Sequence, residues 1–260
     1  MDYQEIFERV ESKYVLTRKQ YMEVMTRIHG RIKPDEFPHS DITSIYFDTD
    51  DYRLIRASLD KNGYREKLRL RSYGIKNGQT PVFMEIKKKY DGVTYKRRQE
   101  MTYDQSRDYI LFDRMPLNTQ IMKEIDYLKN RKQQLNPKVL ISYQRDSWSG
   151  RDDQNLRITF DSDIRFSTTN MLLTNAEPEM KLTDGDTVIM EIKTITAMPL
   201  WLTTILNELR IYPGNFSKYG QIYEKYLAKG ALKWNSYSHQ YIHQPSHLRY
   251  SSSVQLHQSF

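Results

Sequence analysis

The chain has 260 residues, with 40 lysine and arginine against 33 aspartate and glutamate residues, giving a formal net charge of +7 at pH 7. Hydrophobic residues make up 38% of the chain, enough for a sizeable core, which excludes disorder throughout. Cysteine is absent, so disulfides, thiolate metal sites and cysteine nucleophiles are excluded. This length fits one large domain or two small ones, and no apolar run is long enough to span a bilayer, so we expect a cytoplasmic protein.

The end of the chain differs in composition from the rest. Residues 229–260 contain no acidic residue and are rich in serine, histidine and glutamine. Their apolar residues follow no sustained period, so we expect a folded domain over 1–228 and a disordered tail over 229–260. Metal binding by His239 and His243, which stand four residues apart, is the less favoured alternative.

Five segments have the apolar spacing or the capping residues of helices. The expected helices cover 18–29 after Thr17, 104–112 with Asp104 as N-cap, 119–135, a segment after Pro199, and a segment from about Ser217.

Apolar and polar residues alternate between these helices, as they do in strands with one buried face. We expect strands at 43–48, 65–71, 82–89, 93–100, 139–148, 156–161 and 187–193. The polar faces carry mainly lysine and arginine; Arg65, Lys67, Arg69 and Arg71, for example, share one face. Like charges on neighbouring positions repel, so such a face indicates an anionic ligand.

Two architectures fit these strands. In the first, an open sheet packs one face on helices and leaves the other in water. In the second, the sheet closes into a barrel with a polar interior and helices outside. Alternation alone favours the open sheet, whereas the basic character of the polar faces favours the barrel.

Seven motifs, in order, resemble the VTC domain, the polyphosphate polymerase module of the vacuolar transporter chaperone complex and its bacterial relatives. They are SIYFDTDDY (44–52), KLRLRSYG (67–74), VFMEIKKKYDGVTYKRR (82–98), ISYQRDSW (141–148), RITFDSDIRF (157–166), VIMEIKT (188–194) and NFSKYGQIY (215–223). That family belongs to the triphosphate tunnel metalloenzymes. The resemblance therefore implies an α+β fold: a closed antiparallel β-barrel, or tunnel, with a polar basic interior and flanking helices.

The resemblance also implies roles for individual residues. The positions that match catalytic phosphate-holding groups are Arg69, Arg71, Lys87 and Lys218. The positions that match substrate-binding residues are Lys13, Arg56, Lys96, Tyr143, Arg145 and Ser217, with Lys193 expected to replace a family lysine where this chain has Asn215. Glu191 matches the metal-binding glutamate, which implies Mn²⁺ or Mg²⁺ as cofactor.

The activity implied by the resemblance is transfer of the terminal phosphoryl group of ATP to a growing inorganic polyphosphate chain. The expected partners are ATP, pyrophosphate and polyphosphate. A membrane-protein partner encoded elsewhere is possible, and no nucleic-acid partner is expected. A triphosphatase or polyphosphatase on the same scaffold is one alternative, although the segment 9–13 keeps only Glu11 and Lys13 of the E-x-E-x-K pattern of related hydrolases. A non-catalytic polyphosphate-binding module is the other. No GxxxxGK motif occurs, which excludes a P-loop.

Overall fold

The computed structural model describes residues 10–75, 77–91, 93–132, 134–173, 178–195 and 197–228. The tail expected over 229–260 lies outside the described residues.

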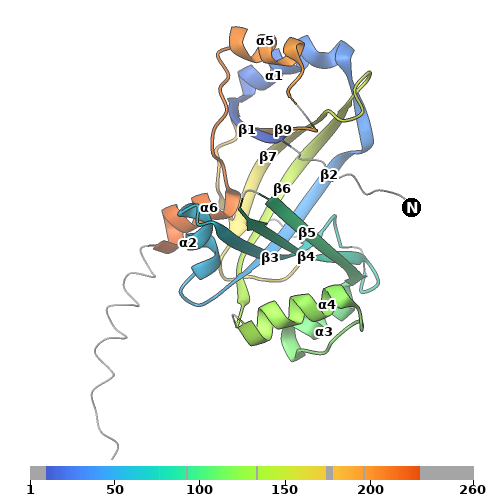
Figure 1. The fold of residues 1–260 in the computed structure, drawn as a ribbon, viewed down its shortest axis with the longest axis vertical. Helices are drawn as coiled ribbons and strands as arrows, with labels where there is room; N and C mark the ends of the chain where they lie inside the picture. Colours follow the sequence, from blue (N-terminus) through green and yellow to red (C-terminus); the bar gives the residue numbers. More distant parts are fainter. Residues whose placement is uncertain are drawn as a thin grey trace, which may run out of the picture.

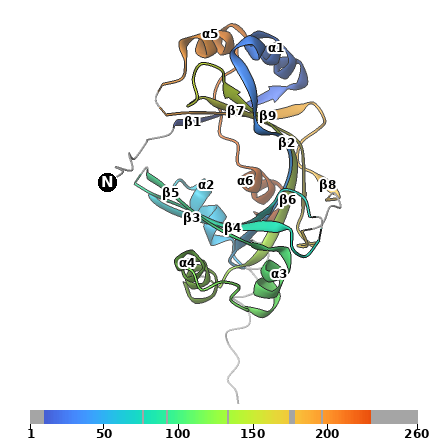
Figure 2. The ribbon, with the colours of Figure 1, turned by 90° about the vertical axis from the view of Figure 1, so that its right-hand side faces the viewer.

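The described strands form one antiparallel sheet in the order β1-β9-β7-β6-β2-β3-β4-β5, with the short β8 paired to β7. The strands are β1 (Val10–Thr17), β2 (Ile32–Asp48), β3 (Tyr64–Ser72), β4 (Pro81–Tyr90), β5 (Val93–Thr102), β6 (Asn136–Gly150), β7 (Arg157–Ser167), β8 (Met180–Lys181) and β9 (Thr187–Thr194). Figure 2 shows the sheet curved into a C, with β1, β9 and β7 on one side and β3, β4 and β5 on the other. The long strands β2 and β6 join the two sides, and register shifts along their pairing help them to bend.

Closure of the barrel is not confirmed. The path of paired strands ends at β1 and at β5, and over the described ranges no backbone pairing joins these two edges. Both edges carry basic side chains, Lys13 on β1 and Lys96 and Arg98 on β5, so direct pairing of the edges would add repulsion between like charges. The fold is therefore a deeply curved antiparallel sheet with flanking helices.

Helices cover the convex side of the sheet in two groups (Figure 1). Helices α1 (Arg18–Ile28) and α5 (Leu200–Glu208) pack on the β1-β9-β7 side, and α3 (Tyr103–Phe112) and α4 (Gln120–Asp126) pack on the β3-β4-β5 side. Helices α2 (Arg53–Leu59) and α6 (Lys218–Ile222) lie beside each other at the end of the sheet. Short single-turn segments complete the helical parts: His29–Arg31 after α1, and π-helical Tyr127–Lys132 and Tyr223–Leu227 after α4 and α6.

The predicted alternation decides which face of each strand is buried. Leu68 and Leu70 of β3 and Met84 and Ile86 of β4 pack on the convex side in the core beneath α3 and α4. Each contributes about 1.5–3 kcal/mol when fully removed from water. The intervening charged residues of the same strands must then face the concave side, because successive side chains point to opposite faces.

Several element boundaries differ from the predictions. Helix α3 is capped by Thr102, whose side chain forms a capping box with Gln105, and not by Asp104, which falls in the first turn. The predicted helix over 119–135 is a shorter α4 followed by the π-helical turn. Strand β2 begins at Ile32, eleven residues before the expected 43. The added part contains Pro34 and Pro38, and the strand accommodates these prolines where its pairing with β6 is irregular, between Pro34 and His39. Within the residues that the structure describes, no helix has the length and apolarity needed to cross a membrane.

Candidate functional site

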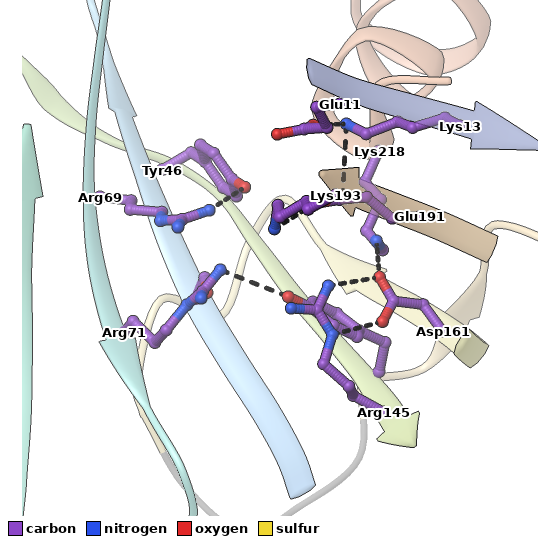
Figure 3. A network of polar contacts seen from close by, with 12 residues as sticks. Glu11, Lys13, Tyr46, Arg69, Arg71, Arg145, Asp161, Glu191, Lys193 and Lys218 are labelled. Atoms are coloured by element: carbon purple, nitrogen blue, oxygen red, sulfur yellow. Dashed lines mark hydrogen bonds and ion pairs between the residues drawn. The ribbon is translucent and has the colours of Figure 1, made fainter. Parts of the chain in front are cut away.

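The concave face of the sheet gathers charged side chains from both of its sides. In Figure 3, Arg69 and Arg71 extend from β3 toward Arg145, Asp161 and Glu191 on the opposite side. The strand register places them there: Arg69 lies between Tyr46 of β2 and Glu85 of β4, and Arg145 of β6 lies across from Asp161 of β7. Three carboxylates on this face each form ion pairs with two or three basic side chains, and we call such a carboxylate a hub.

Glu85 is the hub of the β3-β4-β5 side. Its carboxylate, 2% exposed, pairs with Arg69 (Nε to Oε2, 2.7 Å), Arg98 (Nε to Oε1, 2.7 Å) and Lys96 (Nζ to Oε1, 3.1 Å). Burial by itself would raise the pKa of Glu85, but the charges of Arg69, Arg71 and Lys96 outweigh it and hold that pKa far below its usual range. The glutamate therefore stays ionised and fixes the direction of three cations.

Tyr46 lies beside the same arginines. Arg69 donates from Nη1 to the Tyr46 hydroxyl at 3.2 Å. Burial opposes ionisation of this phenol, but Arg69, Arg71 and Lys67 overcome that effect and lower the pKa of Tyr46 to about 7. The basic side chains around Tyr46 therefore favour negative charge at this position.

Arg71 has a different environment from Arg69. Its guanidinium is buried and donates to the hydroxyls of Ser44 (Nε to Oγ, 3.3 Å) and Tyr143 (Nη2 to Oη, 3.3 Å), with Tyr73 as a further hydroxyl partner. In the described part of the chain no carboxylate lies within ion-pair distance of it. A buried charge whose direct hydrogen-bond partners are hydroxyl groups is costly, and an anionic ligand in contact with it would reduce that cost.

Asp161 is the hub of the β6-β7 part of the face. It accepts a two-pronged contact from Arg145 (Nε to Oδ1, 2.6 Å; Nη2 to Oδ2, 2.8 Å) and an ion pair from Lys218. The Lys218 ammonium also lies 4.2 Å from the centre of the Tyr143 ring. Burial would raise the pKa of Asp161, yet Lys218 and Arg145 lower it to about 2. The two basic residues are therefore held in fixed positions around Tyr143.

Glu191 is the third hub, on β9. Its carboxylate pairs with Lys193 and, at 3.8 Å, with Lys13 of β1; Lys13 also lies 3.2 Å from Glu11. Burial alone would raise the pKa of Glu191, but the charges of Lys193, Lys13 and Arg145 have the larger effect and lower this pKa to about 2. Two carboxylates and two lysines are thus brought together at the β1 edge.

A buried aspartate at the end of β2 positions α2 and α6. Asp48 ends β2 and accepts the backbone N–H groups of Leu54 and Ile55 at the start of α2. It also accepts the Tyr219 hydroxyl of α6 at 3.0 Å. Tyr219 follows Lys218 directly, so Asp48 helps to fix the segment that brings Lys218 to Asp161.

Most of the predicted site residues meet on this face. Those brought together are Lys13, Arg69, Arg71, Lys87, Lys96, Tyr143, Arg145, Glu191, Lys193 and Lys218. Two behave differently: Arg56 is exposed on α2 and bonds the carbonyl of Asp51 at 3.3 Å, and the Ser217 hydroxyl caps α6 by accepting the N–H of Gly220. Their predicted contact with substrate stays a prediction.

Sequence reasoning missed the hubs Glu85 and Asp161 and the hydroxyl partners Ser44 and Tyr46. The alternation did place Glu85 and Asp161 on the polar faces of their strands. Their role as hubs depends on which residue lies across from them on the next strand, and that register is not visible in the pattern of one strand.

The donor set at the β1 edge suits a divalent cation only in part. Among the described residues no group of three histidine, aspartate or glutamate side chains is arranged to hold a metal. Mg²⁺ usually takes one or two carboxylates and completes its shell with phosphate oxygens and water, and Glu191 with Glu11 provides such a pair. The residues therefore fit a metal that arrives with a phosphate ligand.

The curved antiparallel sheet, with its basic concave face and the helices on its convex side, has the elements of the tunnel fold that the resemblance implies, but the pairing of its strands does not close in the described residues. The family model described as the VTC domain matches residues 8–227, and the chain belongs to that family. A comparison of sequences with curated proteins finds no significant match.

The similar solved structures have low sequence identity to this chain. An adenylate cyclase candidate from Bacillus halodurans is 14% identical, with a TM-score of 0.53 over 84% of this chain and 97% of that one. A Hippeastrum adenylyl cyclase candidate, described as having a dominant triphosphatase activity, is 13% identical, with a TM-score of 0.49 over 86% of this chain and 96% of that one. Family membership assigns the chain to proteins that handle polyphosphate or triphosphate, for which a divalent metal is expected.

Proposed function

We propose that the protein is a metal-dependent polyphosphate polymerase that transfers the terminal phosphoryl group of ATP to the end of an inorganic polyphosphate chain. The observation that supports this most directly is Arg71, a buried cation held by hydroxyl groups and facing Arg145 and Lys218 across the concave face. Cations that converge from opposing strands suit a ligand with oxygens on all sides, as a phosphate chain has.

In the proposed reaction an oxygen of the terminal phosphate of the chain attacks the γ-phosphorus of ATP. A new P–O–P bond forms as the bond between the γ-phosphorus and the β–γ bridging oxygen breaks, and ADP leaves. The attacking oxygen is already anionic, so no general base is needed. The protein has to align the reactants and neutralise charge, which is the main requirement of phosphoryl transfer.

Each side of the face then has a task. Arg69 and Arg71 would hold the transferred phosphoryl group from β3, and Arg145 and Lys218 from the other side. Glu85 and Asp161 keep these donors oriented before substrate arrives, so little reorganisation is needed. The lysines Lys13, Lys87, Lys96 and Lys193, together with Arg56, would neutralise neighbouring phosphates, and Ser217 would start the helix that carries Lys218.

The metal, Mn²⁺ or Mg²⁺, would be held by Glu191 and Glu11 together with phosphate oxygens. When bound, it would offset the negative charge of the phosphates. Lys13 and Lys193, which pair with these carboxylates in the free protein, would then be released to bind phosphate.

A bound polyphosphate chain would also bring the β1 and β5 edges of the sheet closer together. Polyanion between the β1 and β5 edges would offset the positive charges of Lys13 and Lys96 and draw the two sides together into a tunnel. The use of ATP is in keeping with a cytoplasmic location, and a membrane-protein partner could receive the product.

The test is to incubate the protein with ATP, Mn²⁺ and a pyrophosphate primer and to resolve the products by chain length. The proposal predicts long polyphosphate. Free phosphate without chains would assign a triphosphatase or polyphosphatase, and tight polyphosphate binding without turnover in Mn²⁺ or Mg²⁺ would assign a binding module.

A further inference from the structure

Two aromatic side chains lie together on the otherwise charged concave face, at the end where β3 stops. Phe83 falls between the buried Val82 and Met84, so its ring points to the concave side. The three concave positions that follow it in β4 are all charged: Glu85, Lys87 and Lys89. Tyr73 follows β3 directly and packs against Phe83, with ring centroids 5.8 Å apart and an angle of 73° between the ring planes. We call Tyr73 and Phe83 the aromatic pair.

The ring of Tyr73 is 45% exposed, yet its position is fixed. Its hydroxyl accepts hydrogen bonds from Arg71 and from Arg98 (Nη2 to Oη, 3.4 Å), and Phe83 supports the ring from one side. The guanidinium of Arg98 also lies 4.6 Å from the centre of the Phe83 ring, which holds Phe83 in place in turn. Within the described residues neither ring belongs to an apolar core cluster. An exposed aromatic ring that needs no further ordering is a preformed surface for stacking.

The aromatic pair suits a different ligand group from phosphate. The face of an aromatic ring carries partial negative charge and does not attract an anion. Glu100 of β5 lies directly across from Phe83 and is exposed, so its carboxylate adds repulsion against a phosphate at this position. The group that fits the aromatic pair is flat, aromatic and uncharged. Because the pair lies beside Arg71, that group should belong to a ligand that also carries phosphate.

A nucleoside triphosphate has both of these parts. The hydrogen bond between Arg71 and Tyr73 places a phosphate-holding guanidinium next to the exposed ring. In ATP a ribose and two further phosphates separate the base from the γ-phosphate. A base on Tyr73 therefore leaves the γ-phosphate further across the concave face, on the side of Arg145, toward which Arg71 extends (Figure 3).

We propose that Tyr73, supported by Phe83, is the platform on which the nucleobase of ATP stacks, and that it makes the protein prefer a nucleoside triphosphate to inorganic tripolyphosphate. This inference rests on the proposed use of ATP. Every base has an aromatic face, so stacking on Tyr73 accepts GTP as well as ATP. The platform also gives the bound triphosphate a direction, with the α-phosphate toward Tyr73 and the γ-phosphate toward Arg145.

The test compares two substitutions at one position. Tyr73→Phe and Tyr73→Leu both remove the hydroxyl that Arg71 and Arg98 contact, but only Tyr73→Leu removes the ring. Tyr95→Leu, which removes an exposed tyrosine from the convex face of β5, is the control. Calorimetry measures the affinity of the wild type and of each variant for tripolyphosphate and for the β,γ-imido analogue of ATP, which is not a phosphoryl donor.

Tyr73→Leu should bind the ATP analogue about tenfold more weakly than Tyr73→Phe, as expected when one base loses its aromatic partner. The two variants should bind tripolyphosphate equally, because this ligand has no base. Salt weakens the ion pairs to phosphate but not the stacking, so the tenfold difference should remain when the salt concentration is raised. Tyr95→Leu should match the wild type with both ligands.

Equal affinities of Tyr73→Leu and Tyr73→Phe for the ATP analogue would overturn the inference. A difference of the same size with tripolyphosphate would also overturn it, because the ring would then act on the phosphates and not on the base. A wild type that makes no polymer would instead contradict the polymerase proposal. The comparison of the two Tyr73 variants then still decides the role of the ring, since binding requires no turnover.

Discussion

The basic residues of the concave face differ in whether a carboxylate balances their charge. This difference predicts which of them contributes most to binding a phosphate. Arg69 and Arg145 each have a carboxylate partner, whereas the hydrogen-bond partners of Arg71 in the described ranges are hydroxyl groups. A ligand gains most where the protein itself leaves a buried charge unmatched.

Arg71→Ala should therefore reduce polymer synthesis by about 100-fold or more, the usual effect of removing one donor from a charge-stabilising site. The fold should persist, because removal of this guanidinium relieves crowding of like charges. The measurement is the initial rate of chain synthesis together with the thermal midpoint. Arg97→Ala, on the convex face of β5 and 3.8 Å from Glu124, is the control and should keep wild-type activity. Wild-type activity in Arg71→Ala would show that β3 does not line the site.

Tyr46 should report on the arrival of an anion. With its pKa lowered from 10.0 to about 7, Tyr46 loses its proton in the free protein above about pH 7, when no ligand offsets the charges of Arg69, Arg71 and Lys67. A polyanion offsets these arginines and raises the tyrosine pKa again, so binding between pH 7 and 10 should take up a proton. Calorimetry of tripolyphosphate binding at pH 8 in buffers of different ionisation enthalpy measures this uptake. Tyr46→Phe should abolish it, and an unchanged uptake in that variant would refute the assignment.

Glu191→Gln should shift the metal requirement more than the affinity for ATP. The substitution removes one of two carboxylates at the β1 edge but leaves the arginines around the phosphates in place. Titration of activity with Mn²⁺ should show a midpoint at least about tenfold higher, as expected when a metal loses a charged ligand. Superimposable metal titrations of wild type and variant would rule out the metal role of Glu191.

Elements of the fold are connected at the site by buried carboxylates that join strands to helices. Asp161 ties β7 to α6 through Lys218, and Asp48 ties β2 to α2 and to α6. Helix α6 is only five residues long, and its position depends on these side-chain contacts more than on its own backbone bonds.

Asp161→Asn should destabilise the protein by about 3 kcal/mol, because it leaves Arg145 and Lys218 without their buried partner. It should also change the response to acid. The pKa of Asp161 is lowered from 3.8 to about 2 in the folded state, so the stability it contributes is complete above about pH 4 and is lost as pH falls through 2. Chemical denaturation between pH 5 and 2 should therefore show a shallower loss of stability in the variant than in the wild type. Parallel curves would contradict the account of this hub.

The sequence alone predicted the helices and strands better than the pairing between strands. The alternation in β3, β4 and β5 gave the correct face for Arg69, Lys87 and Lys96, because the period of a strand is a local property. The capping residue Thr17 and the start of α6 after Ser217 also follow from local chemistry. Register and curvature are not local: the Arg145–Asp161 and Arg69–Glu85 contacts join strands whose alignment depends on the whole sheet.

The whole molecule combines a rigid convex side with a charged, open concave side. Apolar clusters under α1 with α5 and under α3 with α4 hold the two sides of the sheet, and the edges β1 and β5 remain without backbone partners in each other. The barrel expected from the resemblance therefore differs from the structure where β1 and β5 lie without backbone pairing between them in the described residues.

The central claim is that the basic concave face transfers phosphoryl groups from ATP to a chain and not to water. The most direct measurement is ³¹P NMR of a reaction with ATP and Mn²⁺, recorded after the metal has been removed. The account predicts that the γ-phosphate signal of ATP declines while the signal of internal chain phosphates grows by the same amount, with ADP formed in equal measure. Growth of the free phosphate signal in place of the internal chain signal would contradict it.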